Sequence, residues 1–236
     1  MKKIGYPVVL KPVGGNHGRG ATINVMNRDS AVEALFIAKK VSRGVIIEKF
    51  ITGFDHRLLV INYNFVAGAR RTPAMITGDG IHTVQQLINL VNADPRRGYG
   101  HEKVLTSIKV DDMTMSMLEE KGLTLESVLK KNEDLHLKRT ANLSTGGTST
   151  DVTEIVHPYN VFMAERIARI IGLDICGIDI MTPDISVPLY ENGGAVLEVN
   201  AGPGFRMQCP SGKTLSATTL FTRAISSTVL MSFNPR

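Results

Sequence analysis

The stretch Val196-Leu197-Glu198-Val199-Asn200 places a carboxylate and an amide within an apolar, strand-forming run near the C-terminal end of this chain. An earlier run of the same kind, residues 177–181, carries Asp179. A carboxylate in a buried strand costs several kcal/mol unless it is paired or bound to a cation. Three oxygen-bearing side chains on adjacent strands suit Mg²⁺, which binds a few protein oxygens together with substrate phosphates. The sequence therefore predicts a magnesium site formed by Asp179, Glu198 and Asn200.

The composition is that of a soluble globular protein, with 43% hydrophobic and 21% charged residues among 236. No apolar run is long enough to cross a membrane and no signal peptide precedes Lys2-Lys3-Ile4, so we expect a cytoplasmic protein without a membrane partner. Cys176 and Cys209 lack the spacing of metal ligands. Because Cys176 lies in an apolar run, we expect it in the core.

The net charge of +5 and the pI of about 9.2 admit an anionic partner, either nucleic acid or a small ligand such as a nucleotide. The chain has no run of five basic residues and no Trp, and few aromatic residues alternate with Lys or Arg. These absences disfavour nucleic acid. We therefore expect a nucleotide ligand and no nucleic-acid partner.

The order of the expected elements mixes helices with hairpins, which favours an α+β fold over a doubly wound parallel sheet. The hairpins come from the turn residues around Asn62-Tyr63 and from a glycine-rich loop early in the chain. The helices follow apolar periodicity, with Asp29-Ser30 as a cap of the first and Gly172 as the end of the strongest. We expect strands at 6–12, 21–25, 45–50, 57–61 and 64–69, and helices at 29–41, 83–91, 111–131, 158–171 and 215–231.

The inner faces of two helices are predicted from the spacing of their apolar residues. In the helix at 29–41 the predicted face contains Val32, Leu35, Phe36 and Ala38. In the helix at 158–171 the inward residues are predicted to be Val161, Phe162, Ala164, Ile167, Ala168 and Ile171. The polar, helix-rich part at about 83–138 is predicted to be an insertion or lid.

The loop Gly14–Gly20 joins two strands and exposes backbone N–H groups that can bind phosphate. It is neither a Walker A loop nor a dinucleotide-binding turn, because no helix begins there. A flexible hairpin without a ligand is the alternative. Lys11 precedes the loop on an apolar strand and requires an anionic partner, which is either a phosphate or a structural carboxylate.

The segment Glu48-Lys49-Phe50-Ile51 ends a strand and is a candidate adenine site, in which backbone groups contact the purine edge and apolar side chains pack on its face. The alternative is a strand end with charges in solvent. Asp55 follows shortly afterwards and is a candidate ligand of ribose hydroxyls.

Taken together, a strand lysine, a glycine-rich hairpin, a Glu-x-Phe-Ile segment and a late Asp … Glu-x-Asn pair resemble the ATP-grasp superfamily of carboxylate–amine ligases. Four further strings are more specific and closely resemble the ATP-grasp part of the cyanophycin synthetases. The bifunctional glutathione synthetases share some of these strings and are the nearest competitor. The strings are Thr72–Val84, Asp94–Gly98, Thr140–Gly147 and Gly202–Met207.

The resemblance implies an ATP-grasp fold with two α+β subdomains, residues 1–51 and 52–236, that bind ATP and two Mg²⁺ ions between them. It also implies the reaction. A peptide carboxylate attacks the γ-phosphate, and the amine of aspartate then displaces phosphate from the acylphosphate to extend a poly-aspartate backbone.

The same resemblance assigns roles to residues. Arg139 and Arg57 would act on the phosphoryl group and around the peptide carboxylate, where Ser144, Gly146 and Gly147 would also lie. Asp179 and Glu198 would bind one Mg²⁺, and Glu198 and Asn200 the other. Lys11, Gly15, His17, Gly18 and Gly20 would hold the phosphates, Glu48, Lys49, Phe50 and Ile51 would surround the adenine, and Asp55 would bind the ribose.

Parts of the family pattern are missing from this sequence, namely an N-terminal region with a further lysine and the Mur-ligase-like half. We therefore expect the chain alone to bind Mg-nucleotide weakly and to make no polymer. Two other functions stay open, a glutathione-synthetase-type ligase and a non-catalytic nucleotide-binding module. A homo-oligomer is also left open.

Overall fold

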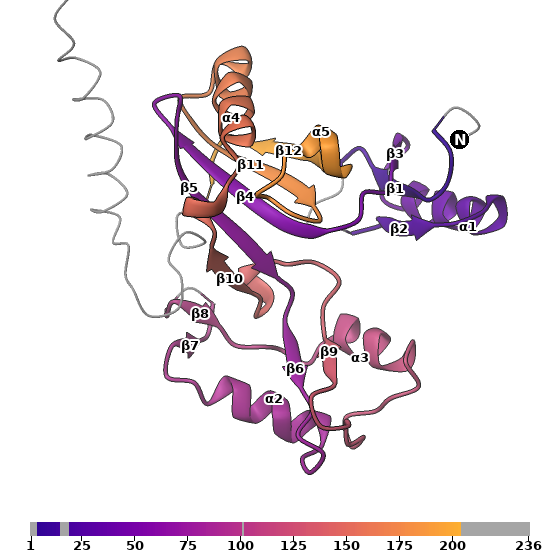
Figure 1. Ribbon diagram of the computed structural model, residues 1–236. Helices are drawn as coiled ribbons and strands as arrows, with labels where there is room; N and C mark the ends of the chain where they lie inside the picture. Colours follow the sequence, from indigo (N-terminus) through magenta and orange to yellow (C-terminus); the bar gives the residue numbers. More distant parts are fainter. Residues whose placement is uncertain (1–3, 15–18, 101, 204–236) are drawn as a thin grey trace, which may run out of the picture. The chain divides into compact units, whose positions relative to one another are not determined.

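The computed structural model describes residues 4–14, 19–100 and 102–203, and the chain divides into two compact units, Met1–Thr52 and Gly53–Arg236 (Figure 1). The helix expected at 215–231 and Cys209 lie outside the described residues. Each unit is built on its own antiparallel sheet. No helix among the described residues is long and apolar enough to cross a membrane.

The first unit packs one helix on a three-stranded sheet. The strands β1 (Val8–Pro12), β2 (Thr22–Val25) and β3 (Val45–Lys49) lie in the order β2-β1-β3, and α1 (Arg28–Lys39) follows β2. The predicted hairpin of β1 and β2 is therefore confirmed. Gly20 precedes β2 with a φ of +76°, a backbone conformation that favours glycine.

The prediction of the inner face of α1 was right only in part. Ala38 is buried and Leu35 packs against the core of this unit as expected, but Val32 and Phe36 are exposed and Ala31 and Ala34 are buried. Small side chains on the buried face let a helix lie close to its sheet, and α1 uses them in place of its larger apolar residues. The helix also begins one residue earlier than expected, because the Oδ1 of Asn27 caps it by accepting from the backbone N–H of Ser30 at 2.9 Å.

The second unit is centred on a five-stranded sheet with the order β10-β5-β4-β11-β12. Its central hairpin turns at Asn62 and Tyr63, both with positive φ, as the two central residues of a tight hairpin require. The predicted hairpin is thus confirmed. The strands are β4 (Phe54–Ile61), β5 (Asn64–Thr72), β10 (Thr148–Asp151), β11 (Ile175–Thr182) and β12 (Ala195–Asn200), and the short helices η2 (Thr153–Ile155) and α5 (Leu189–Asn192) lie in the connections.

One face of this sheet forms the main core with α4 (Pro158–Ile171). Ile178 and Ile180 pack there with Ala164 and Ala168, and Cys176 is fully buried as expected. Most of the predicted inner face of α4 is confirmed, since Ala164 and Ala168 are buried and Val161 and Ile167 pack against the cluster. Phe162 and Ile171, which we also expected to face inward, are exposed. The alternation of side chains along β4 and β11 places Arg57 and Asp179 on the opposite face.

A second hydrophobic cluster lies in the segment between β5 and β10 and includes Ile76, Ile88, Leu129 and Leu137. The helix predicted at 111–131 ends at Glu119, because Gly122 takes a φ of +66° and the N–H of Leu123 returns to the carbonyl of Leu118. The elements here are β6 (Met75–Thr77), α2 (Val84–Asn92), β7 (Arg97–Gly98), β8 (Leu105–Thr106), α3 (Asp112–Glu119), β9 (Asp134–His136) and η1 (Leu143–Thr145).

Candidate active site

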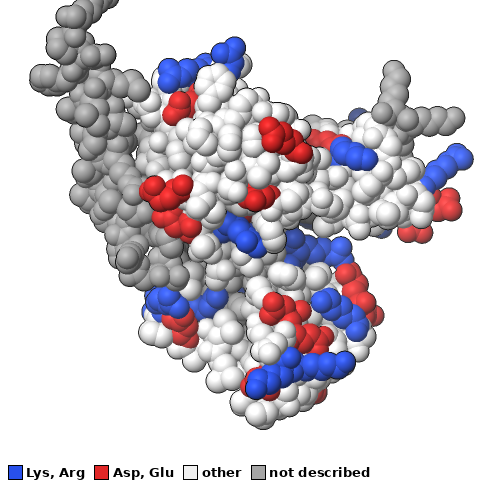
Figure 2. Space-filling model, viewed as in Figure 1, with Lys and Arg blue, Asp and Glu red and all other residues white. Residues whose placement is uncertain are grey.

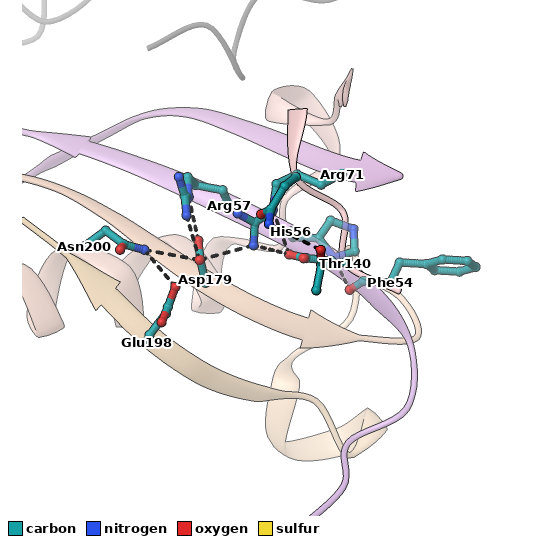
Figure 3. Close-up of polar contacts among 10 residues, drawn as sticks. Phe54, His56, Arg57, Arg71, Thr140, Asp179, Glu198 and Asn200 are labelled. Atoms are coloured by element: carbon teal, nitrogen blue, oxygen red, sulfur yellow. Dashed lines mark hydrogen bonds and ion pairs between the residues drawn. The ribbon is translucent and has the colours of Figure 1, made fainter. Parts of the chain in front are cut away.

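A cluster of charged side chains covers the face of the second unit's sheet that lies opposite α4 (Figure 3). Strand register creates it. Asp179 on β11 pairs with Arg57 on one side and with Glu198 on the other, while Asp55 pairs with Arg71 on β5. Residues two apart on a strand share a face, so all five side chains lie on the same surface.

The centre of this charged cluster is a buried, bidentate ion pair. Arg57 donates from Nε to Asp179 Oδ1 at 2.5 Å and from Nη2 to Oδ2 at 2.7 Å, and both side chains are almost fully buried. Two parallel bonds between guanidinium and carboxylate fix both position and orientation. The pair is therefore the rigid part of the site.

Arg71 links this pair to Asp55. Its Nη2 lies 3.2 Å from Asp179 Oδ2 and 2.5 Å from Asp55 Oδ1. Burial by itself raises the pKa of Asp179, but the hydrogen bond from Arg57 and the charge of Arg71 outweigh burial and hold the pKa below its usual value. Asp179 is thus ionised at neutral pH, which a metal ligand requires.

Glu198 and Asn200 extend the cluster toward solvent. The Nδ2 of Asn200 donates to Asp179 Oδ2 and to Glu198 Oε1, at 3.2 Å in each case. The two carboxylates and the amide therefore converge on one point. Glu198 itself is exposed, contrary to the expectation of two buried acids, because β12 is the edge strand of the sheet.

These three side chains fit a hard divalent cation. Carboxylate and amide oxygens are the ligands that Mg²⁺ prefers, and a rotation of the Asn200 amide would direct its oxygen to the ion. Within the described ranges, no group of three or more His, Cys, Asp or Glu side chains is arranged to hold a metal. A cation bound between Asp179 and Glu198 would therefore need Asn200 as its third protein ligand.

Gly177 provides the room that Arg57 needs. A Cβ atom at residue 177 would lie 3.1 Å from Arg57 Cδ and 2.9 Å from Pro203 Cβ. Both distances are tighter than ordinary van der Waals contact. A side chain at this position would therefore disturb Arg57 directly beside Asp179.

The nucleotide residues predicted in the first unit form a second set of contacts. Lys11 Nζ pairs with Glu48 at 2.7 Å, and both side chains are partly exposed. Of the two partners considered for Lys11, this structure shows the carboxylate. Lys49 Nζ donates to Tyr6 O at 3.0 Å, and the N–H of Phe50 donates to Pro7 O at 3.0 Å. Gly15, His17 and Gly18 lie outside the described residues.

The predicted substrate residues lie in η1 and directly after it. Ser144 is exposed in η1, and Gly146 and Gly147 are buried immediately after it. Gly146 has a φ of +96°, and a Cβ there would lie 2.9 Å from the Cα of Ile108. Arg139 is exposed and pairs with Glu120, not with the cluster of Asp55, Arg57, Arg71 and Asp179.

Arg71 is the member of the charged cluster that sequence reasoning missed. The pairs next to the turn, Ile61 with Asn64 and Val60 with Phe65, place Asp55 opposite Arg70 when the count is continued along the strands. A shift of register between Leu59 and Val60 moves the pairing by one residue and brings Arg71 opposite Asp55. Counting back from the turn alone would therefore not have found Arg71.

The chain is similar to known proteins in both sequence and structure. No family model matches the chain. It is 54% identical over 214 residues to cyanophycin synthetase of Crocosphaera subtropica, covering 90% of this chain and 24% of the relative. It is 39% identical over 204 residues to the bifunctional glutathione biosynthesis protein of Listeria innocua, covering 86% of this chain and 26% of that protein. The chain thus spans about a quarter of the length of these relatives.

Solved structures agree with these relatives. The bifunctional glutathione synthetase of Pasteurella multocida superimposes with a TM-score of 0.66 at 30% identity, over 93% of this chain and 30% of that one. The chain belongs to the ATP-grasp superfamily. The D-alanine–D-alanine ligase of Bacillus anthracis, at 12% identity and a TM-score of 0.52 over 98% of this chain and 57% of that one, shares the fold. The predicted α+β ATP-grasp fold is confirmed.

The burial of the two acids predicts different costs for their removal. Asp179→Ala leaves the guanidinium groups of Arg57 and Arg71 buried beside an empty position, so the free energy of unfolding should fall by about 3–5 kcal/mol. Glu198→Ala removes an exposed side chain and should change the free energy of unfolding by less than about 0.5 kcal/mol. Urea denaturation of both variants measures the difference, and equal losses would contradict the assigned burial.

Proposed function

We propose that this chain carries the ATP-dependent ligation of a carboxylate to an amine, and that it joins aspartate to the carboxyl end of a poly-aspartate backbone. The observation that carries the proposal is the convergence of Asp179, Glu198 and Asn200 beside two buried arginines. The 54% identity to cyanophycin synthetase over 90% of the chain supports this choice of substrates.

The metal ligands divide naturally into two sets that share one residue. Asp179 and Glu198 lie opposite each other on β11 and β12, and Asn200 lies two residues further along the same face. In our proposal one Mg²⁺ is held by Asp179 and Glu198 and a second by Glu198 and Asn200. When bound, Mg²⁺ neutralises phosphate oxygens and orients them for transfer. Glu198 is then the ligand on which both ions depend.

The arginines contribute positioning and positive charge. Arg57 fixes both oxygens of Asp179, which leaves the carboxylate little freedom to rotate. Phosphoryl transfer is catalysed by positioning and by cationic groups on the oxygens, with little covalent work by the protein. Arg57 and Arg139 are our candidates for stabilising charge on the phosphoryl group and on the oxyanion of the peptide carboxylate.

The first unit supplies groups for the nucleotide in this proposal. The Lys11–Glu48 pair is partly exposed, and such pairs are worth little in water, so a phosphate can replace Glu48 at small cost. We assign Lys11, Gly15, His17, Gly18 and Gly20 to the phosphates. The adenine is assigned to Glu48 and the segment 49–51. Asp55 of the second unit is kept as the ribose ligand, although here it accepts hydrogen bonds from Arg71.

A glutathione-synthetase-type ligase is the second candidate, because the Listeria innocua relative is 39% identical and the Pasteurella multocida structure has a TM-score of 0.66. It would use the same ATP and metal residues with different carboxylate and amine substrates. The choice between the two therefore depends on substrates and not on Mg-ATP binding.

Removal of the shared metal ligand should weaken nucleotide binding only when Mg²⁺ is present. Glu198→Gln keeps the shape of the side chain but removes its charge, and we expect at least a tenfold loss of Mg-ATP affinity, about 1.4 kcal/mol. Isothermal titration with ATP in Mg²⁺ and in EDTA measures it. Glu191→Gln, which removes an exposed charge on α5, is the matched control. Unchanged Mg-ATP affinity in Glu198→Gln would refute the metal site.

Substrates can be tested by placing this chain in the Crocosphaera subtropica relative, in exchange for the 24% that it matches. Phosphate release from ATP is then measured with aspartate and a poly-aspartate primer, and separately with γ-glutamylcysteine and glycine. We expect phosphate release with aspartate and the poly-aspartate primer. This release should be lost in Glu198→Gln and retained in Glu191→Gln. Release with the second pair alone would establish the glutathione-type ligase. No release with either pair, with Mg-ATP still bound, would indicate a nucleotide-binding module.

A further inference from the structure

Arg97 is a buried cation at the start of β7, with only 8% of its surface exposed. Its Nη1 donates to two backbone carbonyls, Thr106 O at 2.7 Å and Gly146 O at 3.0 Å. A guanidinium has five N–H donors, so these two contacts leave other donors for a further partner. Among the described residues, neither Nε nor Nη2 of Arg97 makes a hydrogen bond.

Within the described part of the chain, Arg97 makes no direct ion pair. The nearest acid in sequence is Asp94, whose oxygens accept hydrogen bonds from Arg96, with Nη2 at 2.6 Å from Oδ2 and Nε at 3.0 Å from Oδ1. Burial lowers the pKa of Arg97 and outweighs the opposing charge of Asp94. A buried charge normally has a partner, because desolvation is costly.

Arg97 lines a pocket of about 610 Å³ in the second unit, a volume typical of small-ligand sites. Three consecutive residues of β10, Thr148, Ser149 and Thr150, also line the pocket. Because side chains alternate along a strand, Ser149 lies on the opposite face of β10 from Thr148 and Thr150. Leu90 and Leu105 are among the apolar residues that complete the lining. The pocket thus combines one cation, hydroxyl-bearing residues of one strand and a hydrocarbon surface.

We propose that this pocket binds a carboxylate of an acidic peptide, with the guanidinium of Arg97 as its main partner. A carboxylate matches the fork of N–H donors in a guanidinium, and the hydroxyl groups of β10 can donate to its remaining lone pairs. The apolar wall suits the single methylene group of an aspartate side chain.

The position of Arg97 connects the pocket to the proposed substrate turn. By donating to Gly146 O, Arg97 holds the turn that contains Ser144, Gly146 and Gly147. A peptide carboxylate bound to Arg97 would therefore lie beside the residues that we assign to the peptide. The identity of the ligand rests on the proposed function, whereas the pocket and its charge do not.

The binding test uses the dipeptide L-Asp-L-Asp, without ATP or metal, against the neutral dipeptide L-Asn-L-Asn. NMR or calorimetric titration should show at least tenfold tighter binding of Asp-Asp, and Arg97→Gln should remove that preference. Thr150→Asp is the second variant, because Thr150 is exposed and the change should not affect folding. Its added negative charge should weaken Asp-Asp binding at least tenfold. Asn89→Asp adds the same charge on the exposed side of α2, outside the pocket, and should leave affinity within twofold.

Equal binding of the two dipeptides, or wild-type affinity in both Arg97→Gln and Thr150→Asp, would overturn the proposal. Displacement of Asp-Asp by an equal concentration of inorganic phosphate would overturn the choice of a carboxylate. Glu198→Gln should bind Asp-Asp like the wild type, which separates the two proposals. Loss of Mg-ATP binding with Asp-Asp binding intact would count against the metal site alone, and the reverse result would count against the pocket alone.

Discussion

The ion pair between Arg57 and Asp179 is the interaction on which the candidate site of the second unit depends. It joins β4, the central strand of the five-stranded sheet, to its neighbour β11 and is almost fully buried. A buried pair is stable only when its geometry is good and its remaining donors and acceptors are satisfied. Arg71, Asp55 and Asn200 supply those further contacts. The cluster is thus a connected network, in which loss of one member leaves another charge without a partner.

The sheet separates packing from chemistry by its two faces. One face holds Ile178 and Ile180 against the small residues of α4, and this face provides the hydrophobic stabilisation. The other face holds charged groups whose burial is costly. Rigid strands place Asp179 and Glu198 opposite each other, so the backbone itself organises the site.

Acidic and basic side chains also lie side by side over the visible surface of the described residues (Figure 2).

Much of this arrangement could be predicted from the sequence, and the predictions that were wrong have physical causes. The hairpin at Asn62-Tyr63 and the end of α4 at Gly172 follow from local turn chemistry, and both are present. The inner faces of α1 and α4 were predicted in part, because Ala38, Ala164 and Ala168 are buried as expected, whereas some of the larger apolar residues of both helices are exposed. The helix expected beyond Glu119 was wrong because Gly122 ends it while Leu129 still reaches the core from an extended segment.

Only some members of the charged cluster could be predicted from the sequence. Asp179, Glu198 and Asn200 stand out as polar residues in apolar strands, and their proximity follows from pairing of neighbouring strands. Arg71 required the register of β4 and β5, which depends on a local irregularity. The pocket at Arg97 combines α2, β8 and β10, which no local pattern connects.

The most direct test of the account replaces both members of the central pair by apolar residues, as Arg57→Met with Asp179→Leu. In our interpretation, the pair of Arg57 and Asp179 serves ligand binding and is not required for folding. We predict that the free energy of unfolding is retained within about 1 kcal/mol or rises, because apolar residues of similar volume commonly replace a buried ion pair without loss. Mg-ATP affinity, measured on the same sample, should be lost. Retained Mg-ATP affinity in a folded double variant would contradict the account.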